Sequence, residues 1–351
     1  MRLIDHLKSL GLAPRTARQA LTTGKVWYGD APTADASREV QPERVRYRPS
    51  SPLIRVGRDP VIVYRDEHLA VVWKPAGLLA VPAAGRHDEA SLLGKVSGLL
   101  RQRAFVVHRL DELTSGLMMV ARTAEVAALL RAMFAAHAIE RHYLAIVNGV
   151  FASAPQTQRS FLVRNRGDGL RGASDDEDDP SGREAVTHFS LVEQFGKEAA
   201  LVEARLETGR THQVRIHLAE LGHPVLGDKL YGGHGVGRRL PRYALHACVL
   251  GFRHPVTGRT LRFVAPLADD LEQHTRALRT HTGLLSEPGS RTPARDIGNR
   301  GKHVHETTRT DETAKGARPL GKAARERGQA RPASTRKRRT RQKPPGARRG
   351  P

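Results

Sequence analysis

Residues 105–125 read FVVHRLDELTSGLMMVARTAE and set Asp111 between two apolar runs, with His108 and Arg109 just before it. The flanking runs, FVV and GLMMV, each predict a short buried strand. The Thr-Ser-Gly after Asp111 suits a tight turn, because Gly116 can adopt a positive φ. Two interpretations fit: a functional carboxylate presented by a loop between strands, or an aspartate that only caps the turn.

Similar strand-like runs recur through the middle of the chain, bounded by Gly, Pro, Asp or Asn. They are VIVYRD, LAVVWKP, GLMMVAR, YLAIVNGV, THFSLVE, ALVEARLE, HACVLGF and LRFVAP. Residues 124–140 instead show helical spacing, with an apolar stripe. The stripe consists of Val126, Leu129, Leu130, Met133 and Phe134. This mixture predicts an α+β fold on an extended mixed or antiparallel sheet.

Composition divides the chain into three regions: a small unit at 1–50, a main domain at 56–275 and a tail at 276–351. The stretch RYRPSSPLIR is expected to link the first two. Within the main domain, RNRGDGLRGASDDEDDPSGRE is polar and glycine-rich, so we expect a mobile surface insertion there. The tail is rich in Arg, Gly and Pro and cannot bury a core, so we expect it to be disordered.

The first region predicts a small α+β unit. Leu3, Leu7 and Leu10 fall on one helical face, and a second helix is expected from Pro14 to Leu21. The pieces KVWYGD and ERVRYRP that follow are typical of short strands. The basic side chains that would project from this unit are Arg15, Arg18 and Lys25.

The net charge of +22 is spread over the whole chain. Residues 281–351 carry +13 of it, and the preceding 280 residues carry +9. A basic body with a basic tail favours a polyanionic partner, nucleic acid first, although a solvated basic surface is the plainer interpretation. With a single cysteine, Cys248, the chain can form neither an internal disulfide nor a Cys-rich zinc site. No apolar run is long enough for a secretory signal or a membrane span, so we expect a cytoplasmic protein.

A second stretch, LETGRTHQVRIHLAELGHPVLGDKLYG at 206–232, predicts a helix that begins after Thr211 as its N-cap and ends near Gly222. Arg210 precedes this helix and Arg215 lies in its first turn, where the helix dipole favours anions. We therefore expect a carboxylate or phosphate near these arginines, unless they are simply solvated. A metal site is disfavoured, because His212, His217 and His223 do not share one helical face. Tyr143, which begins an apolar strand, fits ordinary packing or stacking on a nucleobase.

Five segments, in order, resemble the RluA-type pseudouridine synthases. They are WKPAGLLAVP (73–82), HRLDELTSG around Asp111, ERHYLAIVNG (140–149), the 206–232 stretch, and YALHACVLGFRHPVTG (243–258). Residues 1–50 are more loosely similar to the αL-type RNA-binding domain that often precedes such a catalytic domain. The resemblance implies a pseudouridine synthase fold, no cofactor or metal, and an isomerisation that detaches uracil from ribose, rotates it and rejoins it through carbon 5.

Specific roles follow from the resemblance. Asp111 matches the nucleophilic aspartate, and attack on the sugar and attack on the base are both open. Arg215 matches the arginine that pairs with this carboxylate, and Tyr143 the tyrosine that stacks on the target base and assists proton removal. Leu245 matches an apolar contact beneath that ring, and Arg109 a residue that opens the RNA. The remaining expected contacts are with substrate at His108 and Arg210, and with RNA at Arg15, Arg18 and Lys25.

The expected substrate is large-subunit ribosomal RNA, with transfer RNA as the alternative, and the expected assembly is a monomer without a membrane partner. A non-catalytic RNA-binding or ribosome-assembly factor is a second class, and a hydrolase that uses Asp111 with a histidine is a third. Three features depart from the family pattern: Glu112 and Leu113 after the aspartate, Arg141 where lysine is common, and the acidic insertion near Asp175–Asp179. These departures bear on the choice of RNA rather than on the reaction.

Overall fold

The computed structural model describes residues 1–50, 56–82, 91–174, 179–232 and 240–282. The last residues of the expected linker, the centre of the acidic insertion and the basic tail beyond residue 282 lie outside this part. No helix in the described part is both long and apolar enough to cross a bilayer.

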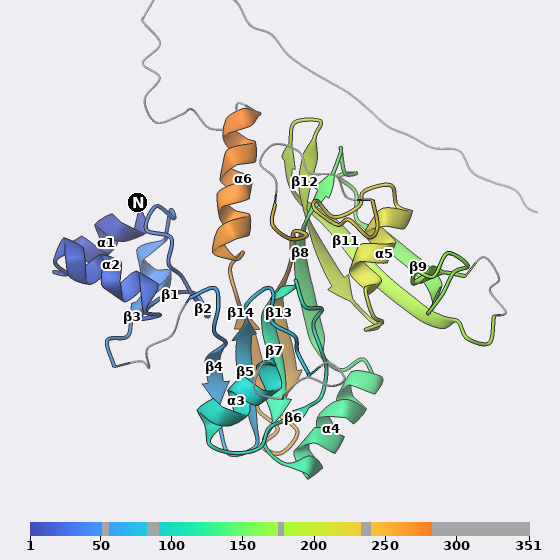
Figure 1. Ribbon diagram of the computed structural model, residues 1–351, viewed down its shortest axis with the longest axis horizontal. Coiled ribbons are helices and arrows are strands. Elements are labelled where there is room, and N and C mark those ends of the chain that lie inside the picture. The colour runs from blue at the N-terminus through green and yellow to red at the C-terminus, as the bar shows by residue number, and fades with distance from the viewer. Residues whose placement is uncertain (51–55, 83–90, 175–178, 233–239, 283–351) are drawn as a thin grey trace, which may run out of the picture. The chain divides into compact units, whose positions relative to one another are not determined.

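The first 50 residues form a small module with its own core (Figure 1). It contains α1 (Leu3–Ser9), α2 (Pro14–Thr22), the 3-10 helix η1 (Pro42–Arg44) and a sheet of β1 (Val26–Tyr28), β2 (Ala31–Pro32) and β3 (Val45–Tyr47). The two predicted helices and two predicted strands are confirmed. Leu3 and Leu7 are buried, but Leu10 is exposed because α1 ends just before it.

One sheet of eleven strands organises the described residues beyond the module, in the order β10-β9-β11-β12-β8-β13-β7-β5-β4 with β14 and β6 at its side (Figure 1). The strands are β4 (Val61–Arg65), β5 (Leu69–Lys74), β6 (Phe105–Val106), β7 (Ser115–Ala121), β8 (Glu140–Asn148), β9 (Gln156–Val163), β10 (Gly172–Ala173), β11 (Arg183–Phe195), β12 (Ala199–Leu206), β13 (Leu245–Arg253) and β14 (Thr260–Val264). All pairs are antiparallel except β13 with β7. The predicted mixed α+β fold is confirmed, as is a strand at each of the eight predicted runs.

The central strands are buried on both faces, which explains their continuous apolar sequences. Alternate residues of β5 and β7 enter two different cores, with Val71 and Met119 on one side and Val72 and Met118 on the other. Helix α3 (Leu92–Leu100) covers the second side and α4 (Ala124–Ala135) the first. Each begins at a hydroxyl cap: Ser91 accepts from Gly94 N, and Thr123 accepts from Val126 N. Leu129 of the predicted α4 stripe is exposed instead of buried.

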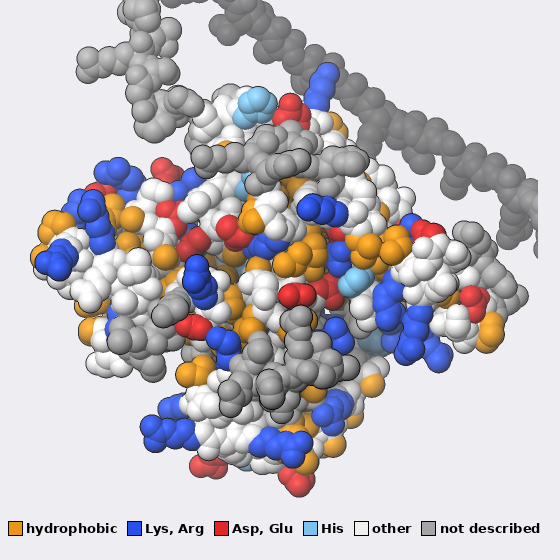
Figure 2. Space-filling model, in the orientation of Figure 1, with side chains coloured by type: hydrophobic (Ala, Val, Ile, Leu, Met, Phe, Trp, Pro, Cys, Tyr) orange, Lys and Arg blue, Asp and Glu red, His pale blue; other side chains and the backbone are white. Residues whose placement is uncertain are grey.

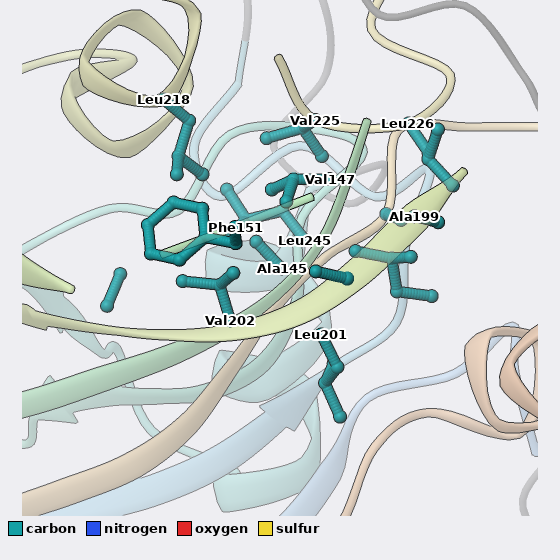
Figure 3. Close-up of a cluster of buried hydrophobic side chains, with 14 of the residues drawn as sticks. Ala145, Val147, Phe151, Ala199, Leu201, Val202, Leu218, Val225, Leu226 and Leu245 are labelled. Carbon is teal, nitrogen blue, oxygen red and sulfur yellow. The ribbon is translucent and has the colours of Figure 1, made fainter. Parts of the chain in front are cut away.

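A third core lies between the far half of the sheet and two helices, α5 (Gln213–Glu220) and α6 (Asp269–His281) (Figure 3). Leu218 of α5 and Leu278 of α6 both enter it. Helix α6 therefore runs past the domain boundary expected at residue 275. The insertion after β9 is also more regular than expected, because β10 pairs with β9 there.

The turn after Asp111 requires glycine where β7 begins. Gly116 has φ +119° and pairs with Ala247 of β13, whose backbone an added Cβ would strike. We therefore expect Gly116→Ala to lower the free energy of unfolding more than Gly77→Ala does. Gly77 also has a positive φ but has open space around it. The difference should be about 1–3 kcal/mol, the usual effect of overpacking.

Urea denaturation of both variants measures this difference. Equal losses would mean that the close approach of β13 does not constrain position 116.

Candidate active site

The centre of the sheet brings the predicted site residues together. Asp111 lies in the loop between β6 and β7, Tyr143 on β8 and Leu245 at the start of β13. In the sheet, β13 lies between β7 and β8. Helix α5, which packs against β9 and β11, contributes Arg215. These residues line one small pocket of about 60 Å³. Its lining also includes Arg109, Leu110, Thr114, Leu206, Arg210, His212, Gln213 and Val214.

The Asp111 side chain faces this pocket, while the local turn is closed by the backbone. Thr114 N donates to Asp111 O at 3.1 Å, which closes the tight turn without the carboxylate. The carboxylate Oδ2 instead lies 3.4 Å from Arg215 NH1 and 3.8 Å from His212 Nε2. Its side chain is 19% exposed. The interpretation of Asp111 as a mere turn cap is therefore wrong.

Arg215 is the buried centre of the site. Its Nε and NH2 donate to the two oxygens of Asp228 at 2.6 and 2.8 Å, and the guanidinium lies 4.1 Å from the centroid of the Tyr243 ring. Burial opposes its charge, but the hydrogen bonds and charge of Asp228 outweigh burial and raise the pKa of Arg215. The anion expected beside the helix start is therefore present twice, as Asp228 and as Asp111.

Asp228 is a partner that the sequence reading did not single out. It is 1% exposed, and its Oδ1 also accepts from the backbone N–H groups of Leu230 and Tyr231. The Asp228 carboxylate therefore holds the turn of the GDKLYG segment at 227–232 and also binds Arg215. The available signal was Arg215, which was expected to need an anion, together with Asp228, an aspartate in a turn-like segment 13 residues further along the chain.

Arg210 is the other arginine that was expected beside an anion, and the structure does not bring it to the Asp111 carboxylate. Its side chain is exposed, and its Nε donates to Glu184 O at 2.9 Å. The predicted N-cap of α5 is also wrong. Thr211 is exposed and precedes the cap position, which His212 occupies with φ +61°.

His108 does not line the pocket. Its Nε2 accepts from Met119 N at 2.9 Å, and its ring stacks on Phe134 with centroids 4.5 Å apart. Burial, followed by the charge of Arg141, lowers the pKa of His108 to about 3, so the ring stays neutral. The structure thus gives His108 a packing contact instead of the expected position beside the substrate.

Two buried cations that sequence reasoning missed fix the loop around Asp111. Lys74, fully buried at the end of β5, donates to the carbonyls of Pro75, Leu78 and Glu112 at 2.7–3.0 Å. Burial, followed by the charge of Arg242, lowers the pKa of Lys74 to about 7, while the charges of Asp111 and Glu112 oppose this shift. The sequence feature that could have indicated this role is the position of Lys74 in WKPAG, the start of the first segment that resembles the family.

Arg242 secures the other side of the same loop. It donates to Leu113 O and Leu245 O at 3.1 Å and to Ser115 Oγ at 3.0 Å, and it pairs with both oxygens of Asp270 on α6. It therefore ties the loop, the start of β13 and the last helix together.

The histidines of the second stretch are dispersed. His217 is buried between the hydroxyls of Thr187 and Ser160, and His223 contacts Asn148 O. Within the described residues, no group of three His, Cys, Asp or Glu side chains is placed to hold a metal ion.

Loss of one partner from the Arg215–Asp228 pair should destabilise the fold strongly, because it leaves the other charge buried and unpaired. We expect Arg215→Met to lower the free energy of unfolding by about 3–5 kcal/mol. Adding Asp228→Asn to it should recover part of this loss. The control is Arg159→Met, which removes an exposed pair with Glu184 and should cost at most about 1 kcal/mol.

Urea denaturation of the wild type, Arg215→Met, Asp228→Asn and the double variant measures the coupling free energy between the two side chains. Strictly additive effects of the two substitutions would show that the pair does not act as a unit.

Comparison with known proteins agrees with this geometry. A family model described as RNA pseudouridylate synthase matches residues 68–220. Ribosomal large subunit pseudouridine synthase D of Xylella fastidiosa is 43% identical over 64% of this chain and 71% of its own length. The protein of the same name from Neisseria meningitidis is 36% identical over 78% of each chain. The solved structure of human RNA pseudouridylate synthase domain containing 1 is similar with a TM-score of 0.50 and 26% identity, over 64% of this chain and 97% of that one.

The matched segment spans the Asp111 loop, Tyr143 and helix α5. With this order of strands and these relatives, the chain belongs to the RluA-type family of RNA pseudouridine synthases.

Proposed function

We propose that this chain isomerises specific uridines of large-subunit ribosomal RNA to pseudouridine, with Asp111 as the nucleophile. The observation that carries the proposal is the Asp111 carboxylate, which lies in a pocket formed with Tyr143 and Leu245 and is oriented by the buried Arg215. The names of the relatives above refer to the large ribosomal subunit, which favours ribosomal RNA over transfer RNA.

Asp111 is suited to this role because only one of its oxygens is engaged. Arg215 and His212 both approach Oδ2. Oδ1 makes no hydrogen bond or ion pair with any residue in the described part of the chain, so it is available to react. The guanidinium of Arg215 binds Oδ2 at 3.4 Å and so orients the carboxylate toward the pocket.

Tyr143 and Leu245 supply an apolar bed for the detached uracil. Leu245 pairs with Ala145, which lies on the same face of β8 as Tyr143 two residues before it. Burial raises the pKa of Tyr143 to about 12, so it stays an uncharged phenol at neutral pH. Its contribution is therefore a ring face on which a base can stack, and the apolar walls retain the free base until it rejoins the ribose.

Exposed arginines around the pocket would hold the RNA backbone. Arg109 and Arg210 line the pocket and are exposed. We propose that Arg109 helps to open the RNA, because a paired uridine must leave its stack to reach Asp111. Arg210 would contact the flanking phosphates.

Two basic surfaces extend this binding face. Figure 2 shows Lys and Arg side chains over α1 and α2 and also over the β9–β11 end of the sheet. Arg15 and Arg18 of α2 are exposed, and Lys25 after it is half-buried. We propose that the N-terminal module binds RNA through this helix, and that deleting it weakens affinity more than the chemical step.

The same chain supplies every residue of the proposed site, which supports action as a monomer. With ribosomal RNA as its substrate, we propose that the protein acts in the cytoplasm. A non-catalytic RNA-binding factor is the competing proposal, and the intact set of Asp111, Tyr143 and Arg215 in one pocket speaks against it.

The test is tritium release from carbon 5 of labelled uridines in large-subunit ribosomal RNA and in transfer RNA. We expect the wild-type protein to release tritium from the ribosomal RNA and Asp111→Asn to do so more than about 10³-fold more slowly, with RNA binding retained. Glu112→Gln is the matched control, because this neighbouring carboxylate is exposed and outside the pocket.

Normal turnover by Asp111→Asn would exclude Asp111 as the nucleophile. Release from transfer RNA alone would exclude the ribosomal substrate. Binding without release from either RNA would favour the non-catalytic factor.

A further inference from the structure

The N-terminal module shares a buried core with the larger domain. Trp27 of β1 and Ala31 of β2 belong to the same buried cluster as three residues beyond the module, Val61, Ala265 and Ala268. Backbone groups also join the two parts, because Asp30 N donates to Val264 O at 3.2 Å and Val264 N donates to the Asp30 carboxylate at 3.1 Å. The module is therefore docked beside β14 and the start of α6.

Asp269, the first residue of α6, holds the module at this junction. Its Oδ1 accepts from Thr33 Oγ1 at 2.8 Å and lies 2.9 Å from Arg38 NH2, while its Oδ2 accepts from Ala34 N at 2.8 Å. Arg38 is buried and also donates to Leu267 O at 2.7 Å. The module thus occupies both carboxylate oxygens of Asp269, at a helix end where an anion is favoured.

A second contact further along α6 fixes the orientation of the module. Arg276 NH1 lies 3.3 Å from Asp35 Oδ2 and donates to Ser37 Oγ at 3.2 Å. Arg276 follows Asp269 by two helical turns, so both residues lie on one face of the helix, about 10 Å apart along its axis. The module therefore holds α6 at two separate points.

Asp270, the next residue, holds the loop of Asp111 through Arg242. Its two oxygens accept from Arg242 Nε and NH2 at 2.7 and 3.0 Å. NH1 of the same arginine donates to the carbonyl oxygen of Leu113, and its NH2 donates to Ser115 Oγ. Two neighbouring carboxylates of one helical turn therefore bind the module and the catalytic loop.

A cavity of about 550 Å³ lies between the parts that these two carboxylates join. Residues of the module, of the catalytic loop and of α6 all contribute to its lining, among them Pro32, Ala34, Leu113, Ser115, Asp269 and Asp270. Packed side chains transmit a displacement, whereas an unfilled space does not. The start of α6 is therefore the direct link between the module and the loop.

We propose that the docked module positions the loop of Asp111, and that Asp269 and Asp270 are the positioning residues that connect them. This inference rests on the proposed function. A small shift of α6 would reach the Leu113 carbonyl through Arg242, and reaction at a positioned group is sensitive to such shifts. The module then has two separable roles, because its helix α2 binds RNA and its junction with α6 supports the reacting carboxylate.

The experiment is a double-variant cycle on the single-turnover rate of the full-length protein with saturating ribosomal RNA, with RNA affinity and stability measured beside it. Asp269→Asn breaks the link to the module, and Asp270→Asn breaks the link to the loop. Thr33→Val, a change of similar shape, weakens the first link from the module side and leaves the start of α6 intact. Glu193→Gln is the matched control, because Glu193 of β11 also binds an arginine of α6 through both oxygens.

We expect Asp269→Asn to slow the saturated rate by about 5–20-fold, a usual coupling between two sites, with RNA affinity within about 2-fold of the wild type. Thr33→Val should show the same pattern more weakly. Asp270→Asn should slow the reaction at least as much, and adding Asp269→Asn to it should cause no further slowing, because the two links act in series. Arg15→Ala combined with Arg18→Ala should instead weaken RNA affinity and leave the saturated rate unchanged.

Rate effects that multiply in the double variant would overturn the inference, since they would show two independent defects. A wild-type saturated rate for Asp269→Asn would overturn it as well, because the module would then act by binding RNA alone. Equal slowing by Glu193→Gln would show that any weakening of α6 has this effect, and would also overturn it. These results are distinct from a failure of the proposed function, in which the wild-type protein itself forms no pseudouridine in any RNA.

Discussion

The buried ion pair between Arg215 and Asp228 is the interaction on which the site depends. Asp228 takes two nitrogens of the guanidinium, and the third is left to face Asp111 across 3.4 Å. A guanidinium can divide its donors between two carboxylates in this way because it is planar and permanently charged. The pair is costly to bury, so its presence in the fold is better explained by positioning than by stability.

The pairing of strands in the sheet assembles the other residues of the site beside this ion pair. The parallel pairing of β13 with β7 brings the loop of Asp111 beside the strand of Tyr143 and the start of β13. Lys74 and Arg242 then fix the loop by binding two successive carbonyl oxygens, those of Glu112 and Leu113. Two buried cations thus hold the backbone, and a third orients the carboxylate, so the reacting group sits on rigid elements although it belongs to a loop.

Much of this arrangement was predictable from local sequence. The strand runs and the glycine at the turn follow from period and residue type, and the expected anion beside Arg215 follows from the helix dipole. Three features were not predicted. Arg215 binds Asp228 in addition to the expected Asp111. Helix α6 continues past residue 275, and its Leu278 enters a core. His212 takes the N-cap position of α5 that was expected for Thr211. Periodicity carries no information about such pairings, so only the assembled sheet reveals them.

The most direct test of the central role of Arg215 is the single-turnover rate of Arg215→Lys on its RNA, measured beside its stability and its RNA affinity. Lysine keeps the positive charge but lacks the fork that binds Asp228 and Asp111 together. If orientation by this fork is what matters, the folded variant binds RNA normally and reacts more than about 10²-fold more slowly, as a small misplacement of a reacting group predicts. A folded lysine variant that reacts at the wild-type rate would show that a nearby positive charge is sufficient, and would contradict the account.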